Sequence, residues 1–294
     1  MKTHAKPFLK WAGSKKQLIH EIINRVPYSR DEPFTFIEPF LGSGAVLFEM
    51  LEQFPNMSQV IVNDINKELI DTYIQIRDNV HKVISQLQEK ADAYFSFSNE
   101  EQKKEYFYKQ RELFNKRSTS KADHAALFIF LNKTCFNGLY RVNKKNEFNV
   151  PMGKYKKPLI CDGENLKLVS IALQKVIFLN GDFEKTEEYI SKPTFVYMDP
   201  PYKPINKTSS FTSYSENSFS DDDQLRLQKY CHTISHKGGF WLLSNSDALD
   251  GYGNSFFDEL YKGFMLERVN VKRFINANAE KRGEVREVLV KNYG

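Results

Sequence analysis

The first seventy residues alternate between short apolar runs and helical patterns, and this alternation constrains the fold more than any other feature. Phe34–Ile37 is an apolar run that stops at Glu38-Pro39. The turn Gly42-Ser43-Gly44 then precedes AVLFEMLEQF, whose apolar spacing is helical. A second buried run, Gln59–Asp64, precedes an expected helix from about Lys67 to Asn79. Strand, glycine turn, helix and strand in this order open a doubly wound α/β domain.

The same rhythm returns in the second half of the chain. A capped helix start is predicted at Ser220–Asp223, and strands are predicted at Val176–Leu179, Thr194–Met198, Gly239–Ser244 and Glu287–Lys291. The sequence from about Asn79 to Lys157 is instead helical, charged and rich in aromatic residues, with a helix from Ala122 to about Lys133. We therefore predict a catalytic domain with a mostly parallel sheet, residues 1–75 and 160–294, and a helical, basic insertion at residues 76–159.

The composition excludes several classes of protein. Hydrophobic residues make up 41% of the chain and charged residues 27%, which is ordinary for a globular protein. No apolar run approaches the roughly eighteen residues of a membrane span, and the N-terminus lacks the apolar core of a signal peptide. The three cysteines include no CxxC pair, which argues against a disulfide framework and a zinc site. The sequence predicts a cytoplasmic protein without a metal.

The net charge of +5 is concentrated in one stretch. Between Lys133 and Lys157 there are seven Lys or Arg residues against one acid, Glu147, so this stretch carries +6 and the rest of the chain −1. A basic surface on a nearly neutral body suits a phosphate backbone. A solvated basic loop would have the same composition, so charge alone leaves both interpretations open.

Asp199-Pro200-Pro201-Tyr202 directly follows the predicted strand that ends at Met198. The carboxyl ends of parallel strands are where such sheets bind ligands. The two prolines remove backbone donors but keep their carbonyl acceptors, the aspartate adds an acceptor, and the tyrosine adds an aromatic face. Acceptors beside a stacking surface suit an aromatic primary amine, although a rigid turn that ends a strand is the alternative.

Gly42-Ser43-Gly44 and Asp64 are typical of a nucleotide-binding turn. Glycines allow a ligand to approach the backbone, and Asp64, at the end of the second strand, suits the hydroxyls of a ribose. The third glycine of a dinucleotide fingerprint is replaced by Leu47, which favours an adenosine-containing ligand without a diphosphate. The alternative for Asp64 is a helix cap. Trp11 and Lys15 near the N-terminus suit an adenine face and a carboxylate, or ordinary terminal packing.

Together and in this order, these segments resemble the Dam-type family of DNA N6-adenine methyltransferases. The matching pieces are FLKWAGSK at 8–15, EPFLGSG at 38–44, NDIN at 63–66, FNGLYRVN at 136–143, EFNVPMGKYKKP at 147–158, GDF at 181–183 and DPPY at 199–202. They span nearly the whole chain, and the middle pieces are specific to this family rather than to methyltransferases at large.

The resemblance implies a Rossmann-like methyltransferase fold with S-adenosylmethionine as cofactor. The residues it assigns to the cofactor are Trp11, Ala12, Gly13, Lys15, Glu38, Phe40, Gly42, Ser43, Gly44, Asp64, Ile65, Asp182, Phe183 and Asp199. The catalytic residues it implies are Asp199, Pro200, Pro201 and Tyr202. Ser14 stands where the family usually has glycine.

The resemblance also implies double-stranded DNA as partner, a flipped adenine as target and GATC as the recognition sequence. The residues that match DNA-contacting positions are Lys10, Phe136, Asn137, Leu139, Arg141, Asn149, Pro151, Lys154 and Tyr155. Phe136 matches the aromatic that wedges into the base stack, Arg141 is our candidate for reading a guanine, and Lys154 stands where arginine is common. We expect a monomer, associated with the nucleoid or encoded by a phage in a bacterial host; pairing with a restriction endonuclease stays open.

Three alternatives remain at the level of sequence. One is a methyltransferase that acts on RNA adenine or on cytosine N4, and another is a non-catalytic DNA-binding relative. The third, a nucleotide-dependent oxidoreductase, is disfavoured by Leu47. The preferred interpretation requires the Asp199 end of its strand to lie on the same side of the sheet as the glycine turn.

Overall fold

The computed structural model describes residues 4–11, 13, 15, 17–203, 219–248, 255–272 and 284–294. The chain divides into two compact units. The first comprises residues 1–14, 42–52 and 64–181, and the second comprises residues 15–41, 53–63 and 182–294. The functional division predicted above, an insertion at 76–159 within a catalytic domain, follows different boundaries and stays a prediction.

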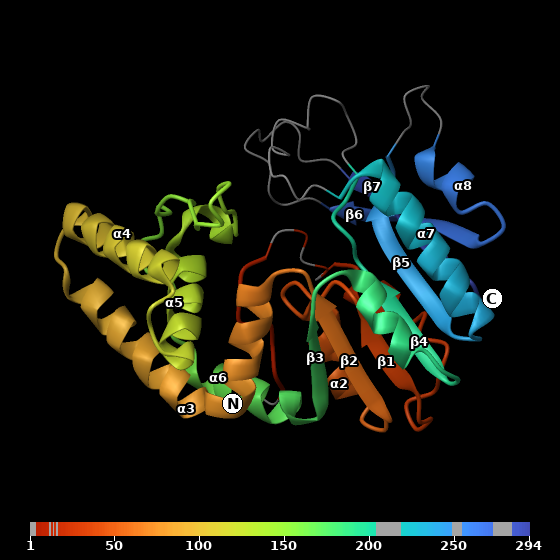
Figure 1. Cartoon of the computed structure of the whole chain (residues 1–294), viewed down its shortest axis with the longest axis horizontal. Helices are drawn as coiled ribbons and strands as arrows, with labels where there is room; N and C mark the ends of the chain where they lie inside the picture. The colour runs from red at the N-terminus through yellow and green to blue at the C-terminus, as the bar shows by residue number, and fades with distance from the viewer. Residues whose placement is uncertain are drawn as a thin grey trace. The chain divides into compact units, whose positions relative to one another are not determined.

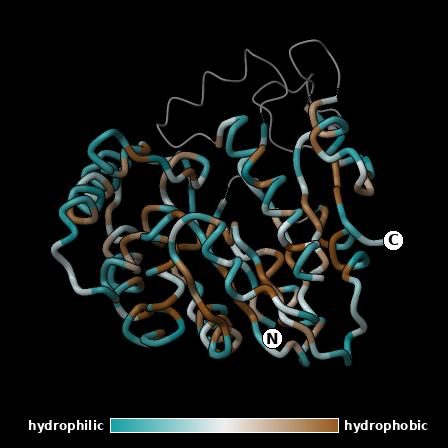
Figure 2. The backbone as a smooth tube through the Cα atoms, turned by 45° about the vertical axis from the view of Figure 1, so that its right-hand side comes forward, coloured by the Kyte–Doolittle hydropathy of each residue, from teal (hydrophilic) through white to brown (hydrophobic). Residues whose placement is uncertain are grey.

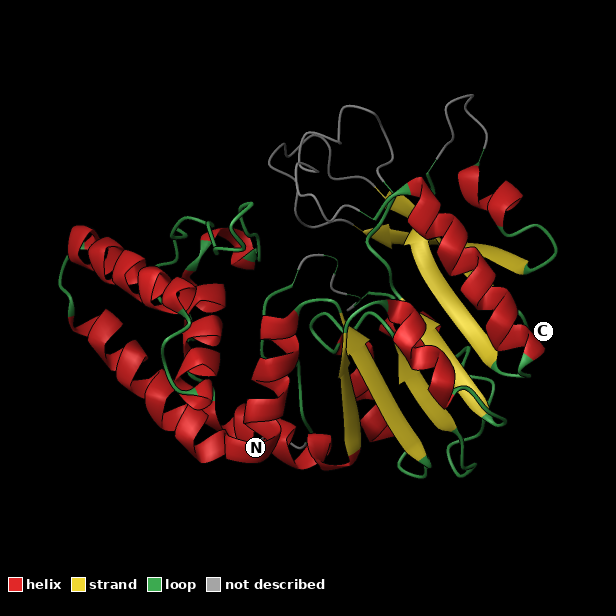
Figure 3. Ribbon diagram, viewed as in Figure 1, coloured by secondary structure: helices red, strands yellow, loops and turns green. Residues whose placement is uncertain are grey.

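The strands form a seven-stranded sheet in the order β3-β2-β1-β4-β5-β7-β6, drawn in yellow in Figure 3. Their bounds are β1 Thr35–Glu38, β2 Gln59–Asp64, β3 Val176–Asn180, β4 Thr194–Met198, β5 Phe240–Ser246, β6 Met265–Lys272 and β7 Glu284–Lys291. Strands β2, β1, β4 and β5 pair in parallel, whereas β7 is antiparallel to both β5 and β6. This order confirms the doubly wound, mostly parallel fold.

The central strands are apolar because helices cover both of their faces. All four residues of β1 and all five of β4 are buried, and the strands are largely hydrophobic along the tube in Figure 2. In the second unit, α7 (Asp221–His236) packs against β5 (Figure 1). It begins, as predicted, at a capping box formed by Ser220 and Asp223. The buried Trp241 of β5 donates its indole N–H to Ser235 of this helix at 3.0 Å.

The helices of the first unit pack around a core of aromatic side chains. They are α2 (Ala45–Gln53), α3 (Lys67–Ser96), α4 (Glu100–Lys116), α5 (Lys121–Thr134) and α6 (Gly163–Ala172). The main contact is between α3 and α5 (Figure 1). Phe107, Phe114, Phe128 and Phe130 are all nearly inaccessible to solvent. Short elements complete the chain: α1 (Ile19–Ile23), α8 (Phe256–Leu260) and the 3₁₀ turns η1 (Phe136–Gly138), η2 (Leu173–Lys175) and η3 (Phe183–Tyr189).

The helix that starts at Lys67 is longer than predicted. The expected end, Asn79, is a non-helical residue (φ −136°, ψ 34°), beyond which the helix continues to Ser96. The carbonyl of Arg77 accepts hydrogen bonds from the side chains of Ser170 and Gln174, which explains a break in the helical hydrogen bonding at this point. Tertiary contacts therefore turn the predicted stop into a kink. Within the described ranges, no helix is long and apolar enough to cross a membrane.

Candidate active site and nucleic-acid interface

The ends of β1 and β4 lie at one edge of the sheet. The two strands are parallel neighbours, with Ile37 opposite Val196, so Glu38 and Met198 end at the same side. Asp199 follows β4 there, and the segment Pro39–Leu41, which leads into the glycine turn, follows β1. The end of β4 that precedes Asp199 and the end of β1 that leads into the glycine turn therefore lie at the same edge of the sheet, as the sequence interpretation requires.

Asp199 is held by two groups of the second unit. Lys15 places its Nζ 2.9 Å from Oδ1, and the hydroxyl of Ser244 on β5 donates to the same oxygen at 3.2 Å. Burial raises the pKa of Asp199 to about 6; Lys15 opposes this shift, and the carboxylate of Glu287 adds to it. The side chain is still 22% exposed, so a substrate group can reach it.

Tyr202 is fixed at its hydroxyl and on its ring face. The hydroxyl donates to Oε2 of Glu287 at 2.5 Å, and the Nζ of Lys15 lies 4.1 Å from the ring centroid. The next residue, Lys203, donates its amide to Asn245 Oδ1 at 3.2 Å and accepts from the Ser246 hydroxyl at 2.6 Å. β5 thus anchors the chain directly after Asp199–Tyr202. Within this motif, Pro200 is buried and Pro201 is exposed.

The glycine turn is bound to Asp64 within the first unit. Oδ2 of Asp64 accepts from the amide of Gly42 at 2.9 Å, and Oδ1 accepts from the amide of Asn66 at 2.9 Å. Burial raises the pKa of Asp64, and these two amides oppose the shift. The cap of the following helix is Asn66, whose side chain accepts from Leu69 at 3.2 Å. Asp64 is therefore free of the capping role that was its alternative.

Close packing at this turn requires glycine at two positions. Gly42 and Gly44 have φ of +49° and +67°. A Cβ at Gly42 would lie 3.0 Å from the Trp11 ring, and one at Gly44 would lie 2.8 Å from the Tyr73 hydroxyl. Ser43 between them is buried. Trp11 thus packs directly on the turn.

The other predicted cofactor residues are divided between the two units. Ile65, next to Asp64, is 72% exposed and offers an apolar side chain beside the carboxylate. In the second unit, the rings of Phe40 and Phe183 lie 5.5 Å apart. Asp182 accepts from Arg226 at 2.9 Å and from the amide of Glu184 at 3.0 Å. Gly13 has φ of +77°, Glu38 is buried at the end of β1, and Ala12 and Ser14 lie outside the described residues.

These residues fit an adenosine-containing cofactor. A tight glycine turn whose backbone packs against Trp11 leaves no room for side chains larger than hydrogen, as a close backbone approach requires. Each oxygen of Asp64 uses one lone pair on an amide and keeps a second for a ribose hydroxyl. The first unit thus supplies a carboxylate that can accept from a ribose hydroxyl, followed in sequence by an exposed apolar side chain.

The predicted DNA-contacting residues form an exposed segment after α5. Phe136 is 50% exposed and Leu139 is 37% exposed, although both are large and apolar. Asn137 has φ of +53°, and the amide of Phe136 is held by the carbonyl of Pro151 at 2.9 Å. Arg141 is also exposed. Apolar side chains presented to solvent beside a basic stretch mark an interaction surface.

Lys10 connects the N-terminal segment to this surface. Its Nζ lies 3.4 Å from the ring centroid of Tyr155 and donates to the carbonyl of Lys133 at 3.3 Å. The buried Asn132 accepts from the amide of Lys10 and donates to the carbonyls of Lys10 and Gly138 at 2.7 and 3.0 Å. One side chain therefore ties residues 10 and 138 together. Lys154 is exposed.

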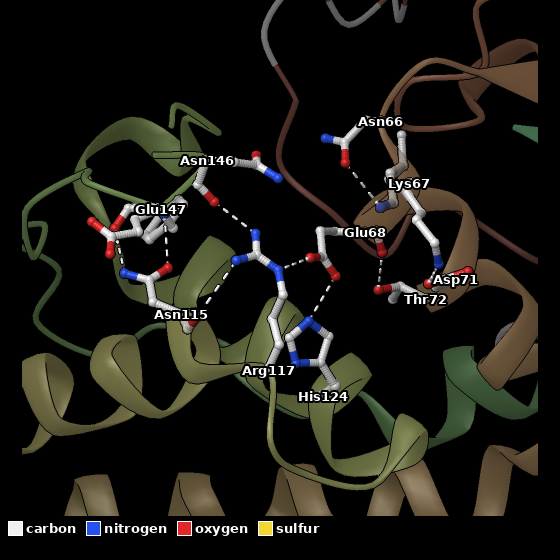
Figure 4. Close-up of polar contacts among 12 residues, drawn as sticks. Asn66, Lys67, Glu68, Asp71, Thr72, Asn115, Arg117, His124, Asn146 and Glu147 are labelled. Carbon is white, nitrogen blue, oxygen red and sulfur yellow. Dashed lines mark hydrogen bonds and ion pairs between the residues drawn. The ribbon is translucent and has the colours of Figure 1, made fainter. Parts of the chain in front are cut away.

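A polar network holds the hairpin of residues 141–149, which is closed by an antiparallel bridge between Val142 and Phe148 (Figure 4). Glu68, in the first turn of α3, contacts Arg117 at 2.9 Å and His124 at 2.6 Å. Arg117 also donates a hydrogen bond to the carbonyl of Asn146 in the hairpin at 2.6 Å. Figure 4 shows these side chains converging from α3, α4, α5 and the hairpin.

A second anchor lies beside the first. The side-chain amide of Asn115 bonds both backbone groups of Phe148, at 3.1 and 2.8 Å. At the base of the hairpin, Arg141 donates to Asn149 Oδ1 at 2.7 Å. Arg141 is therefore oriented by a neighbour in the hairpin, and Asn115 holds the backbone of the hairpin from α4.

Sequence reasoning missed the supporting residues Glu287, Ser244, Asn132 and Glu68. Glu287 carried a weak signal, because an acid directly before the apolar run VLV is unusual in a buried strand. The other three are ordinary polar residues in helices or strands, and only their tertiary partners reveal their role.

Comparison with known proteins identifies the family. Residues 11–275 match the model of the D12 class N6 adenine-specific DNA methyltransferases. A type II methyltransferase of Methanocaldococcus jannaschii, M.MjaIII, is 47% identical, with 98% of this chain and 99% of that protein covered. The type II methyltransferase M1.LlaDCHI of Lactococcus lactis subsp. cremoris is 37% identical, over 100% of this chain and 97% of that protein. A DNA adenine methylase of Haemophilus influenzae is 36% identical, over 97% and 92% of the two chains. The chain therefore belongs to the D12 class N6 adenine-specific DNA methyltransferases, and it is an S-adenosylmethionine-dependent enzyme that acts on adenine in DNA.

Proposed function

We propose that this enzyme methylates the exocyclic amine of adenine in the sequence GATC of double-stranded DNA, after the adenine has left the base stack. The observation that carries the proposal is the position of Asp199 and Tyr202. A partly exposed carboxylate and an anchored aromatic ring follow the same strand, at the carboxyl edge of the sheet.

The bound cofactor supplies an electrophilic methyl group on a sulfonium. The Asp199 carboxylate and the Pro200 carbonyl would accept hydrogen bonds from the two hydrogens of the amine. These bonds weaken the conjugation of the nitrogen lone pair with the ring, and they stabilise the positive charge that develops on nitrogen as the bond to carbon forms. Tyr202 would stack on the purine and align it for in-line attack.

The cofactor would be held by the residues that the sequence interpretation assigns to it. Asp64 is proposed to accept from the ribose hydroxyls, with Ile65 against the adenine and Trp11 and the 42–44 turn forming the wall. The other proposed cofactor contacts are Gly13, Lys15, Glu38, Phe40, Asp182, Phe183 and Asp199. Support comes from the amide bonds of Asp64 and from the steric need for Gly42 and Gly44.

Recognition of DNA is assigned to residues 76–159 and the N-terminal segment. Extruding a base costs roughly a few kcal/mol, which the intercalated ring of Phe136 and the basic stretch would offset. Arg141 would read a guanine through its O6 and N7 acceptors. Its bond to Asn149 and the exposure of Phe136 support these roles.

The enzyme is proposed to act as a monomer. Two of the relatives are named type II methyltransferases. We therefore also propose that it protects DNA against a restriction endonuclease that cuts the same sequence. A plasmid from a methylase-deficient host that expresses this protein should resist endonucleases blocked by methylated GATC.

The test is incubation of mixed-sequence duplex DNA with purified protein and S-adenosylmethionine, followed by mapping of modified bases. Methyl groups on the adenine of GATC, and their loss in Asp199→Ala, support the proposal. Methylation of another sequence overturns the assignment of GATC. Unchanged transfer in Asp199→Ala overturns the catalytic role.

A further inference from the structure

Glu287 is a buried acid at the catalytic edge of the sheet. Only 9% of the residue is exposed, although its neighbours Val288, Leu289 and Val290 are apolar core residues. β7 runs antiparallel to β5, and Glu287 lies opposite Ser246, the last residue of β5. The beginning of β7 thus reaches the edge at which the parallel strands end. A carboxylate is costly to bury unless it has hydrogen-bonding partners.

The partner of this carboxylate is the tyrosine of the catalytic motif. The hydroxyl of Tyr202 donates to Oε2 of Glu287 at 2.5 Å. The opposite constraint on the ring comes from Lys15, whose Nζ lies 4.1 Å from the centroid. The ring is therefore fixed in both rotation and position.

We propose that Glu287 is a positioning residue for methyl transfer: it holds the plane of Tyr202 against the target base, and its charge acts on Asp199. The inference rests on the proposed function, because it assumes that Tyr202 stacks on adenine and that Asp199 accepts from the amine. A stacking ring guides the reaction only when its orientation is fixed before the base arrives. Glu287 supplies that constraint from β7, 85 residues after Tyr202 in the sequence.

The second part of the role is electrostatic, and it follows from the strand pairing. Leu289, two residues after Glu287 on β7, lies opposite Ser244, whose hydroxyl donates to Asp199 at 3.2 Å. Burial raises the pKa of Asp199 to about 6, Lys15 opposes the shift, and Glu287 adds to it. Among the described residues, two other titratable groups interact with Asp199: Tyr197 on β4 and Tyr202. The charge of Glu38 on β1 in turn raises the pKa of Tyr197. A nearby negative charge disfavours ionisation of a second carboxyl group and so raises its pKa. Removing the charge of Glu287 should therefore lower the pKa of Asp199.

The experiment compares two substitutions that separate orientation from charge. Glu287→Gln keeps an acceptor for the Tyr202 hydroxyl but removes the charge. We expect its kcat at pH 8 to stay within about threefold of wild type. The acid limb of its kcat–pH profile, where activity falls as pH is lowered, should move to lower pH by roughly half a unit or more. Glu287→Ala removes the acceptor as well, and its kcat should fall about tenfold or more. Since the ring acts after DNA has bound, the KM for DNA should change little.

A double-mutant cycle tests whether Glu287 acts through Tyr202. Tyr202→Phe keeps the ring and removes the hydroxyl, so adding Glu287→Ala to it should cause little further loss of kcat. Independent, multiplicative losses would contradict the proposed coupling. The matched control is Glu267→Gln on β6, a carboxylate of the same sheet that pairs with Arg25 and Lys291. It should leave both kcat and the acid limb unchanged.

Folding and cofactor affinity are measured for every variant, by thermal unfolding and by calorimetric titration with S-adenosylhomocysteine. If wild type transfers no methyl group to GATC, the proposed function has failed. If wild type is active while Glu287→Ala and Glu287→Gln retain its kcat and pH profile, the inference about Glu287 is wrong and the proposed function stands. If Glu287→Ala is less active only because it is unfolded, Glu287→Gln still tests the electrostatic role. An acid limb of Glu287→Gln at the wild-type pH would refute that role.

Discussion

The amide of Gly42 donates to Oδ2 of Asp64 at 2.9 Å, which joins the turn after β1 to the end of β2. The other oxygen of Asp64 accepts from the amide of Asn66, at the start of α3. One carboxylate thus sets the backbone of both loops proposed to surround the cofactor. Its effect on cofactor binding should exceed that of any exposed acid on α3.

Asp64→Asn is expected to weaken cofactor binding. The amide replaces one acceptor oxygen by an NH₂ donor, which cannot satisfy both backbone amides and loses a charged acceptor for the ribose. We expect the Kd for S-adenosylhomocysteine to rise about tenfold or more, measured by calorimetry. Asp71→Asn, which removes a carboxylate paired with Lys67 on the surface of α3, is the control and should leave the Kd unchanged. Equal affinities of wild type and Asp64→Asn would refute the assignment.

Asp199→Ala is expected to abolish methyl transfer while DNA and cofactor still bind. A protonated carboxyl group is a weaker acceptor for the amine hydrogen and brings no negative charge to the developing cation, so the rate should fall as pH drops through the pKa of Asp199, about 6. The measurement is the pH profile of kcat/KM for DNA. A rate that is flat from pH 8 down to pH 5 would show that ionisation of Asp199 is not needed.

The sequence identified the strands and the motifs for local reasons. β1, β2, β4 and β5 are short apolar runs bounded by turn residues, and Asp199–Tyr202 follows one of them directly. The parallel arrangement then places their carboxyl ends together without further information. This is why Asp64 and Asp199 could be predicted as site residues from their positions alone.

The residues that support the site depend on topology that no local pattern encodes. Glu287 reaches Tyr202 because β7 enters the sheet antiparallel between β5 and β6, and β6 itself, MLERVNVK, carries too many charges to be predicted as a strand. α3 is kinked at Asn79, where Ser170 and Gln174 take the carbonyl of Arg77. In each case, a contact distant in sequence overrides the local signal.

Arg141→Ala is expected to relax the recognition sequence at one position. Loss of a bidentate contact to guanine costs about 1–3 kcal/mol of discrimination. The measurement compares kcat/KM on GATC with that on sites altered at single positions. Lys144→Ala, an exposed residue of the same hairpin, should instead weaken binding to all sequences equally. Equal discrimination in wild type and Arg141→Ala would reject the role of Arg141.

Arg117→Ala is expected to reduce discrimination between GATC and altered sites, although Arg117 is not proposed to contact a base. Arg117 links Glu68 to the carbonyl of Asn146 in the hairpin. A looser hairpin lowers kcat/KM on GATC more than on altered sites, while affinity for S-adenosylhomocysteine stays at the wild-type value. Arg111→Ala is a control on the neighbouring part of α4, where Arg111 donates to Val150 instead of the hairpin tip. If Arg117→Ala discriminates as well as wild type, Asn115 alone suffices to hold the hairpin.

Glu68→Gln is expected to lower stability at neutral pH but not in acid. Burial alone would raise the pKa of Glu68, but the hydrogen bonds from His124 and Arg117 outweigh burial and place it below the ordinary 4.5. A depressed pKa means that the ionised carboxylate stabilises the folded state above pH 4.5, and that this contribution is lost as pH falls through the lower, folded-state value. Urea unfolding should therefore show a deficit of about 1 kcal/mol for the variant at pH 7, shrinking as the pH is lowered below 4.5. Glu105→Gln, which removes a fully exposed partner of Lys109, should unfold like wild type at both ends of the range. A deficit for Glu68→Gln that does not change with pH would mean that packing, rather than the charge of Glu68, holds α3, α4 and α5 at this point.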